Sequence, residues 1–342
     1  MRLRFLPVLL VAALAVFLIA CGDDDDDSDV TGATGADDRL NVVSSVSPIT
    51  SLAENIGGTK IRLEGIVPEG TNSHTFEPPV SVVRTLTEAD IIIINGLQLE
   101  EPLLDLAEAN KKADAIILQL GDLTIDPGQY KYDFSFPEDE GKPNPHLWPE
   151  PFLALAYAEH IKDALVEADP DNADYYEANY SALEARIDTL DEALQATVAT
   201  IPEENRKLLT YHDSWAYFAE RYGMTVIGAV QPSDFSEPSA REVGGLIDQI
   251  RAEQVPAVFG SEVFPSPVLQ QIASEGGAEF VDELRDDDLP GAPGEALHSY
   301  LGLMVQNMRI MAPALGGNAS AMDNVDTSFV FTDGESSATY PQ

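Results

Sequence analysis

Residues 171–198 read DNADYYEANYSALEARIDTLDEALQATV, a stretch without glycine or proline. Its apolar residues recur at steps of three and four, which predicts one stripe along a helix: Tyr176, Tyr180, Leu183, Ile187, Leu190 and Leu194. Pro170 precedes the stretch and Pro202 follows it, as helix limits require. At about 1.5 Å per residue, this helix is about 45 Å long. We expect a rigid spine that allows only modest closure of the parts it joins.

On both sides of this helix, short apolar segments alternate with helix-length segments. The predicted strands are 41–45, 60–67, 91–94 and 115–120 before it, and 207–211, 225–230, 257–260 and 279–281 after it. Their runs of Val, Ile and Leu lack clean alternation, which is typical of parallel strands covered on both faces. We therefore predict an α/β fold of two lobes, each with a mainly parallel sheet flanked by helices, joined by the long backbone helix. The predicted boundaries are 40–168 for the first lobe, 169–201 for the helix and 202–315 for the second lobe.

The N-terminus indicates export from the cytoplasm. Residues 1–20 form a predicted signal peptide, in which Arg2 and Arg4 precede an apolar run. The run ends Leu18-Ile19-Ala20-Cys21, which resembles the lipobox of bacterial lipoproteins, where the cysteine is acylated. Cys21 is the only cysteine, so no internal disulfide can form. We expect an extracytoplasmic, membrane-anchored lipoprotein.

Two further segments have compositions typical of disorder. Residues 21–39 contain five consecutive aspartates and little apolar surface, which predicts an extended acidic tether. The tail 316–342 is rich in Ser, Asp, Asn and Thr and has no periodicity, so we expect it to be disordered. The formal net charge of −40 argues against nucleic acid as a partner, because phosphates would be repelled.

Three of the five histidines lie in turns beside predicted strands or helices. They are His74 in Gly-Thr-Asn-Ser-His-Thr-Phe-Glu-Pro, His146 in Asn-Pro-His-Leu-Trp and His212 in Thr-Tyr-His-Asp-Ser-Trp. Ligands of open α/β sheets bind beyond the carboxyl ends of the strands, where these turns are expected. Imidazole is the commonest protein ligand for divalent transition metals, and one added carboxylate completes four-coordination. The sequence thus predicts a metal site.

The carboxylate is harder to choose. Asp282 directly follows a predicted strand, but Glu283, Asp286, Asp287 and Asp288 are close in sequence. Glu262, after the strand 257–260, is predicted to orient an imidazole by accepting its second N–H.

The motifs around the three histidines, Phe280-Val-Asp282 and the segment Asp169-Pro-Asp-Asn-Ala-Asp-Tyr-Tyr together resemble the cluster A-I substrate-binding lipoproteins of zinc and manganese ABC importers. The likeness covers about residues 40–315 and implies capture of a metal ion outside the membrane, with delivery to a permease and its ATPase. It implies His74, His146, His212 and Asp282 as ligands, in a protein that is not an enzyme and that we expect to be a monomer.

The resemblance favours the zinc-type members, because manganese-type members tend to carry glutamate at the position of His212. Imidazole donors also favour Zn²⁺. Zinc-type members often have a histidine-rich loop before the second ligand, whereas residues 121–144 contain no histidine. Mn²⁺ and Fe²⁺ therefore stay open as cargo. Two other functions are a surface adhesin and a zinc hydrolase, but the sequence contains neither an adhesive repeat nor a His-Glu-x-x-His motif.

Overall fold

Two parallel four-stranded sheets organise the chain from Arg39 onward, in a computed structural model that describes residues 37–263 and 267–341. The first contains β1 (Leu40–Ser44), β2 (Ile61–Gly65), β3 (Ile91–Ile94) and β4 (Ile116–Gln119), in the order β2-β1-β3-β4. The second contains β5 (Lys207–Thr210), β6 (Thr225–Ala229), β7 (Ala257–Ser261) and β8 (Glu279–Leu284), in the order β6-β5-β7-β8. All pairings are parallel, so both sheets have the same winding.

Ten α-helices accompany the strands in the described residues. They are α1 (Ser47–Gly57), α2 (Val82–Glu88), α3 (Glu101–Asn110), α4 (Leu120–Thr124), α5 (Pro151–Ala168), α6 (Ala173–Ala199), α7 (Ala216–Tyr222), α8 (Ala240–Glu253), α9 (Pro267–Gly276) and α10 (Tyr300–Ala314). Six of them (α1, α2, α3, α7, α8 and α9) supply the crossovers that parallel strands require. The eight predicted strands are all present, with ends that differ from the predicted ones by at most three residues. The predicted two-lobed α/β class is confirmed.

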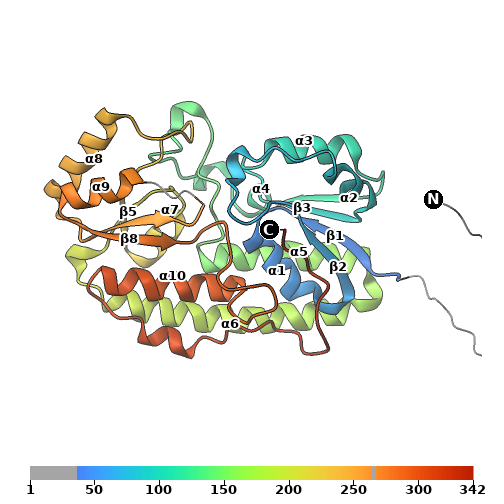
Figure 1. Ribbon diagram of the computed structural model, residues 1–342. Coiled ribbons are helices and arrows are strands. Elements are labelled where there is room, and N and C mark those ends of the chain that lie inside the picture. Colours follow the sequence, from blue (N-terminus) through green and yellow to red (C-terminus); the bar gives the residue numbers. More distant parts are fainter. Residues whose placement is uncertain (1–36, 264–266, 342) are drawn as a thin grey trace, which may run out of the picture. The chain divides into compact units, whose positions relative to one another are not determined.

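The backbone helix is α6, which runs beneath both sheets in Figure 1. Five residues of its predicted stripe are buried, namely Tyr176, Leu183, Ile187, Leu190 and Leu194, and the sixth, Tyr180, is partly buried. The helix packs on α1, α5 and α10, and one apolar core therefore extends from the first lobe into the second. The outer face of each sheet has its own smaller core, under α2 and α3 in the first lobe and under α8 and α9 in the second. The lobes are joined by shared packing as well as by the chain.

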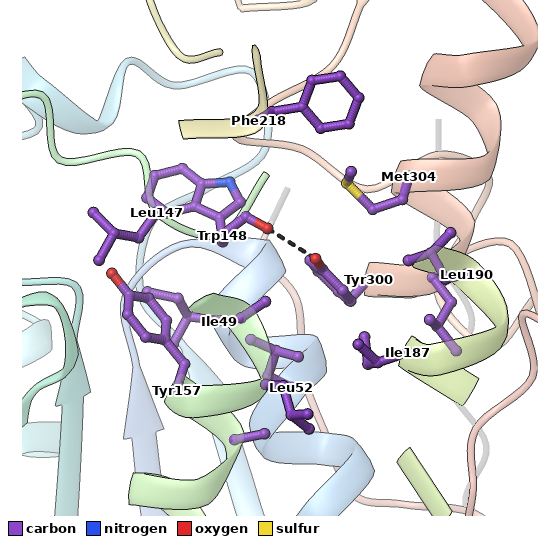
Figure 2. Packing of buried hydrophobic residues seen from close by; sticks show 14 of the residues in the cluster. Ile49, Leu52, Leu147, Trp148, Tyr157, Ile187, Leu190, Phe218, Tyr300 and Met304 are labelled. Atoms are coloured by element: carbon purple, nitrogen blue, oxygen red, sulfur yellow. Dashed lines mark hydrogen bonds between the residues drawn. The ribbon is translucent and has the colours of Figure 1, made fainter. Parts of the chain in front are cut away.

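Figure 2 shows the centre of the shared core, where Trp148 and Tyr300 meet. Both side chains are fully buried, and the Tyr300 hydroxyl donates to the Trp148 carbonyl at 2.9 Å. The indole Nε1 of Trp148 donates to the Asp286 carbonyl at 2.8 Å. Because Trp148 lies two residues after His146, the core fixes a turn from the first lobe against a loop of the second.

The C-terminal tail is ordered as far as Pro341, and the prediction of disorder is wrong there. After a short 3-10 turn at Ser320–Asn324, the chain returns to the first lobe (Figure 1). It ends beside the edge strand β2, where the Thr339 N–H donates to the Leu63 carbonyl at 3.0 Å and the Gly65 N–H donates to the Thr339 carbonyl at 2.9 Å. These contacts join residues more than 270 positions apart, which local composition cannot reveal.

The predicted signal peptide, Cys21 and most of the acidic tether lie outside the described residues. In the part of the chain that the structure describes, no helix combines the length and the apolar character needed to cross a bilayer.

Candidate metal centre

The structure brings the three singled-out histidines together. Their Nε2 atoms form a triangle with edges of 3.2 Å between His74 and His146, 3.3 Å between His74 and His212, and 3.0 Å between His146 and His212. A tetrahedral zinc ion with Zn–N bonds of 2.0–2.1 Å needs nitrogen atoms about 3.3 Å apart. The triangle is therefore of the size that one shared ion requires. Among the described residues, it is the one group of three or more His, Cys, Asp or Glu side chains whose ligand atoms lie close enough together to share an ion.

His74 and His212 lie in turns beyond strands of the two sheets, and His146 lies in a longer connection between two helices. His74 lies in the 3-10 turn Ser73–Thr75 beyond β2, where the Asn72 side chain accepts from its backbone N–H at 2.9 Å. His146 lies in the connection between α4 and α5, and His212 follows β5 directly. The first lobe supplies His74 and His146 and the second supplies His212, as the sequence predicts for loops at the carboxyl ends of parallel strands.

Amide oxygens orient two of the three rings. Asn144 Oδ1 lies 2.8 Å from Nδ1 of His146, and Gln231 Oε1 lies 2.7 Å from Nδ1 of His212. The Asn144 amide nitrogen donates to the Asp213 carbonyl at 2.8 Å, which fixes the oxygen towards the ring. An acceptor at Nδ1 keeps the proton there and leaves the Nε2 lone pair free to bind a metal. Neither amide was predicted to contact a ring, although Asn144 lies only two residues before His146.

The imidazoles are neutral at neutral pH. Burial lowers the pKa of His74 and of His146 well below 6.5, and the neighbouring imidazoles lower both pKa values further. Burial also lowers the pKa of His212, although nearby Asp287 opposes the shift. Neutral rings with converging lone pairs are ready for a cation without first losing protons.

Carboxylates from one loop lie next to the triangle. Asp286 Oδ2 is 3.7 Å from Nε2 of His212, and Asp287 Oδ2 accepts from the Ser73 hydroxyl at 2.7 Å. Both side chains are almost completely buried. Asp286 Oδ2 and Asp287 Oδ1 have no hydrogen-bond partner among the described residues. Buried carboxylate oxygens without a donor are costly unless a cation is nearby, so these atoms fit a metal centre.

Glu262 fixes this loop and does not orient an imidazole. Its Oε1 accepts from the backbone N–H groups of Asp286, Asp287 and Asp288 at 3.0, 3.1 and 3.1 Å. The predicted contact with an imidazole N–H is therefore wrong, and Gln231 and Asn144 take that role. Burial, together with the adjacent aspartates, raises the pKa of Glu262 well above its ordinary value.

Burial also raises the pKa of Asp286 to about 6 and that of Asp287 to about 7, so the loop carries less negative charge at neutral pH than its sequence suggests. A bound cation would favour the ionised forms of these carboxyl groups.

The backbone of Asp282 belongs to β8, but its side chain lies outside what the structure describes. Its predicted role as ligand stays a prediction. The position of Asp286 shows that a carboxylate from the loop directly after β8 comes within 3.7 Å of His212, and Asp287 binds Ser73, the residue before His74.

Two parallel α/β lobes on a long helix, with buried imidazoles converging from both lobes, define a metal-binding solute-binding protein of the kind that serves ABC importers. The chain belongs to the family described as "Zinc-uptake complex component A periplasmic", whose model matches residues 42–314.

Relatives and solved structures agree with this membership. The chain is 29% identical to the manganese-binding lipoprotein MntA of Halalkalibacterium halodurans, over 87% of this chain and 94% of that protein. It is also 29% identical to the iron-binding protein YfeA of Yersinia pestis, over 81% and 87%. A crystal structure of ZnuA superposes with a TM-score of 0.69 at 28% identity, covering 82% of this chain and all of that one. The periplasmic zinc-binding protein TroA of Treponema pallidum has the same fold, with a TM-score of 0.74 at 24% identity, covering 81% and 99%.

Proposed function

We propose that this protein captures Zn²⁺ outside the cytoplasm and delivers it to the permease of an ABC importer. The observation that supports this most strongly is the triangle of three Nε2 atoms with edges of 3.0–3.3 Å, built from neutral imidazoles of which two are buried and one, His74, is partly exposed. Three imidazoles with one carboxylate form a closed tetrahedral set, which suits an ion that is held and released rather than one that activates water.

The choice of Zn²⁺ as the transported ion is based on the ligand atoms, three of which are imidazole nitrogens. Imidazole favours Zn²⁺ over Mn²⁺, and His212 keeps the nitrogen-rich set. The names of similar proteins include manganese-binding and iron-binding ones, so Mn²⁺ and Fe²⁺ are the alternatives. The fourth donor in this proposal comes from Asp286, whose unpartnered Oδ2 lies 3.7 Å from Nε2 of His212, or from Asp287, the next residue, whose Oδ1 is also unpartnered. Asp282 is the candidate from sequence.

In this proposal the protein acts outside the cytoplasm, held at the membrane by a lipid anchor. Similar proteins are named as lipoproteins of metal ABC transporters, which supports a lipid anchor on Cys21 after removal of residues 1–20. A single compact body from Arg39 onward, acting as a monomer beside the membrane, would load the ion and then dock on the permease.

Metal-dependent stability tests this function. Protein stripped with a chelator should gain about 4 kcal/mol in free energy of unfolding when free Zn²⁺ is a thousandfold above its dissociation constant. His146→Ala should abolish most of this gain, because it removes one vertex of the triangle. His160→Ala, in α5 and outside the triangle, is the matched control and should keep the full gain.

The same metal titration, followed by calorimetric or fluorescence-monitored unfolding, identifies the fourth ligand when it is repeated on aspartate variants. Repeated with Zn²⁺, Mn²⁺ and Fe²⁺, it identifies the metal. Asp286→Asn or Asp287→Asn should weaken zinc binding by at least about tenfold, and Asp282→Asn should not. A wild-type protein whose unfolding is unchanged by Zn²⁺, Mn²⁺ and Fe²⁺ would refute the proposal. Turnover of ester or phosphate substrates after zinc addition would instead point to a hydrolase.

A further inference from the structure

His74 is held differently from the other two rings of the triangle. His146 and His212 each have an amide oxygen at Nδ1 and are almost completely buried. For His74, the neighbour is another ring: Phe235 stacks on it with centroids 4.3 Å apart and planes 20° apart. Within the described residues, no side-chain amide takes the place at His74 that Asn144 and Gln231 take at the other two rings. The ring of His74 is thus positioned by stacking.

Phe235 adopts a backbone conformation that a bulky residue rarely takes. Its φ is 57°, in the left-handed region, within the turn closed by its N–H on the Pro232 carbonyl at 3.0 Å. Side chains other than those of glycine, asparagine and aspartate are uncommon there because Cβ crowds the following carbonyl. Such strain persists where surrounding contacts hold it, and it clusters at ligand clamps. The contact that holds Phe235 is the stack on His74.

A second aromatic residue closes the same side. Phe136 lies 5.6 Å from the His74 ring and 6.1 Å from the Phe235 ring, centroid to centroid. It belongs to the segment between β4 and α5, whereas Phe235 belongs to the turn between β6 and α8. The two segments are tied by the Ser233 hydroxyl, which donates to Glu140 Oε1 at 2.7 Å, and by the Ser135 hydroxyl, which donates to the Gln231 carbonyl at 2.6 Å.

The outer side of these rings is a small cavity. It measures about 80 Å³ and is lined by His74, Phe136 and Phe235 together with polar residues that include Glu140, Lys142 and Ser233. His146 and His212 are almost completely buried and do not line this cavity, and the fully buried Trp148 packs on His146 with centroids 5.1 Å apart. His74 is therefore the vertex that faces the cavity, and Phe235 lies flat over it.

We propose that Phe235 is a positioning residue that holds His74 in the ligand triangle and controls the rate at which the metal ion enters and leaves. In this mechanism the ion exchanges through the cavity, after Phe235 lifts from His74 and that ring swings out. His146 and His212 stay in place, because their Nδ1 contacts and burial do not change. The left-handed backbone at Phe235 lowers the cost of lifting, since leaving the stack relieves the strain. The inference rests on the proposed capture of a metal ion at the triangle.

Exchange kinetics test this role. Phe235→Ala removes the ring that stacks on His74. An aromatic pair of this kind typically changes an equilibrium constant by a factor of about 3–10. Zinc dissociation, followed by stopped flow with a coloured chelator, should accelerate by about tenfold. The association rate should rise as well, so the dissociation constant changes less than either rate. Phe235→Leu keeps most of the side-chain volume but cannot stack flat on His74, so its rates should lie between those of wild type and Phe235→Ala. It also replaces the alanine variant should that one fold poorly.

A matched control and a metal-free measurement separate this role from a structural one. Phe134→Ala removes an exposed aromatic side chain from the same segment as Phe136 and should leave both rates unchanged. In metal-free protein, diethylpyrocarbonate should modify His74 faster in Phe235→Ala than in wild type, with His146 and His212 unaffected, as read by peptide mass spectrometry.

Wild-type protein that binds no metal would overturn the proposed function itself. A second outcome would overturn only the role of Phe235. In it, wild-type protein binds zinc, but Phe235→Ala has a zinc dissociation rate and a rate of His74 modification within twofold of the wild-type rates. Faster modification of all three histidines would also overturn it, because that result means a general loosening of the fold.

Discussion

Among single residues, Glu100 offers a pH test that is independent of metal. The side chain is 3% exposed, and its Oε1 accepts from the Asn95 N–H at 3.0 Å. Burial raises its pKa from 4.5 to about 7. Between those values the folded state holds more protons than the unfolded state, so this group lowers the free energy of unfolding as pH rises from 4.5 to 7. Above pH 7 the full cost of the buried charge is present.

Glu100→Gln keeps the acceptor and removes the charge. We expect it to raise the free energy of unfolding by about 2–3 kcal/mol at pH 8, in proportion to the pKa shift, with the gain shrinking towards zero at pH 5. Urea unfolding of metal-free protein at both pH values measures this. Glu101→Gln, at an exposed neighbour, should have little effect at either pH. An equal gain at pH 5 and pH 8 would show that the charge is not the cause.

The residues found from sequence at the site share one property. His74, His146 and His212 belong to a rare residue type and lie in turns, so few positions compete with them. The groups that were missed belong to common types, and most of them act on rings distant in sequence; Asn144, two residues before His146, is the exception. Gln231 meets a ring 19 positions away, and Phe235 meets one more than 160 positions away. Such partners follow from the packing of two lobes, which one sequence does not specify.

At the scale of elements, strands were easier to predict than the loops between them. Runs such as Ile91–Ile94 are apolar on both faces and bounded by polar residues, and β3 occupies those four positions. The carboxylates in and after β8 were harder to tell apart, because Asp282, Asp286, Asp287 and Asp288 are chemically equivalent in a sequence. The last three are placed by the Glu262 carboxylate, which accepts from their backbone N–H groups in the loop that brings Asp286 towards His212.

One ion pair joins the backbone helix to the second lobe. Asp191, in α6, accepts from Nε and the terminal nitrogen of Arg221 at 3.1 and 3.0 Å, and from the Tyr222 hydroxyl at 2.8 Å, both in α7. Asp191→Ala would leave the buried Tyr222 hydroxyl without this acceptor, whereas Nε of Arg221 keeps Glu150 Oε1 at 3.0 Å. We expect a loss of about 1–2 kcal/mol in free energy of unfolding, measured in urea. Asp188→Ala, on the exposed side of α6, should cost little. Equal losses in both variants would mean that the ion pair contributes nothing.

Across the whole molecule, the tail is the feature that composition misrepresented. The family model ends at residue 314, and the chain beyond it returns from α10 to the first lobe. Its polar residues pair with specific partners: the Ser299 hydroxyl donates to the Thr327 carbonyl at 2.7 Å, and the Tyr175 and Thr59 hydroxyls donate to Asp333 at 2.8 and 2.7 Å. A segment can lack periodicity and still be ordered when a preformed surface supplies its hydrogen-bond partners.

The tail should therefore contribute to the stability of the body it crosses. Glu54, in α1, is 7% exposed, and its carboxylate accepts from the Ser336 and Tyr340 hydroxyls. Ending the chain after Val325 removes both donors and the pairing with β2, and it leaves a buried carboxylate without them. At about 1 kcal/mol for each hydrogen bond, we expect a loss of at least about 3 kcal/mol and a lower melting temperature by calorimetry. Tyr340→Phe removes a single donor and should cost about 1–2 kcal/mol. A truncated protein that melts with the full chain would show that the tail only rests on a fold complete without it.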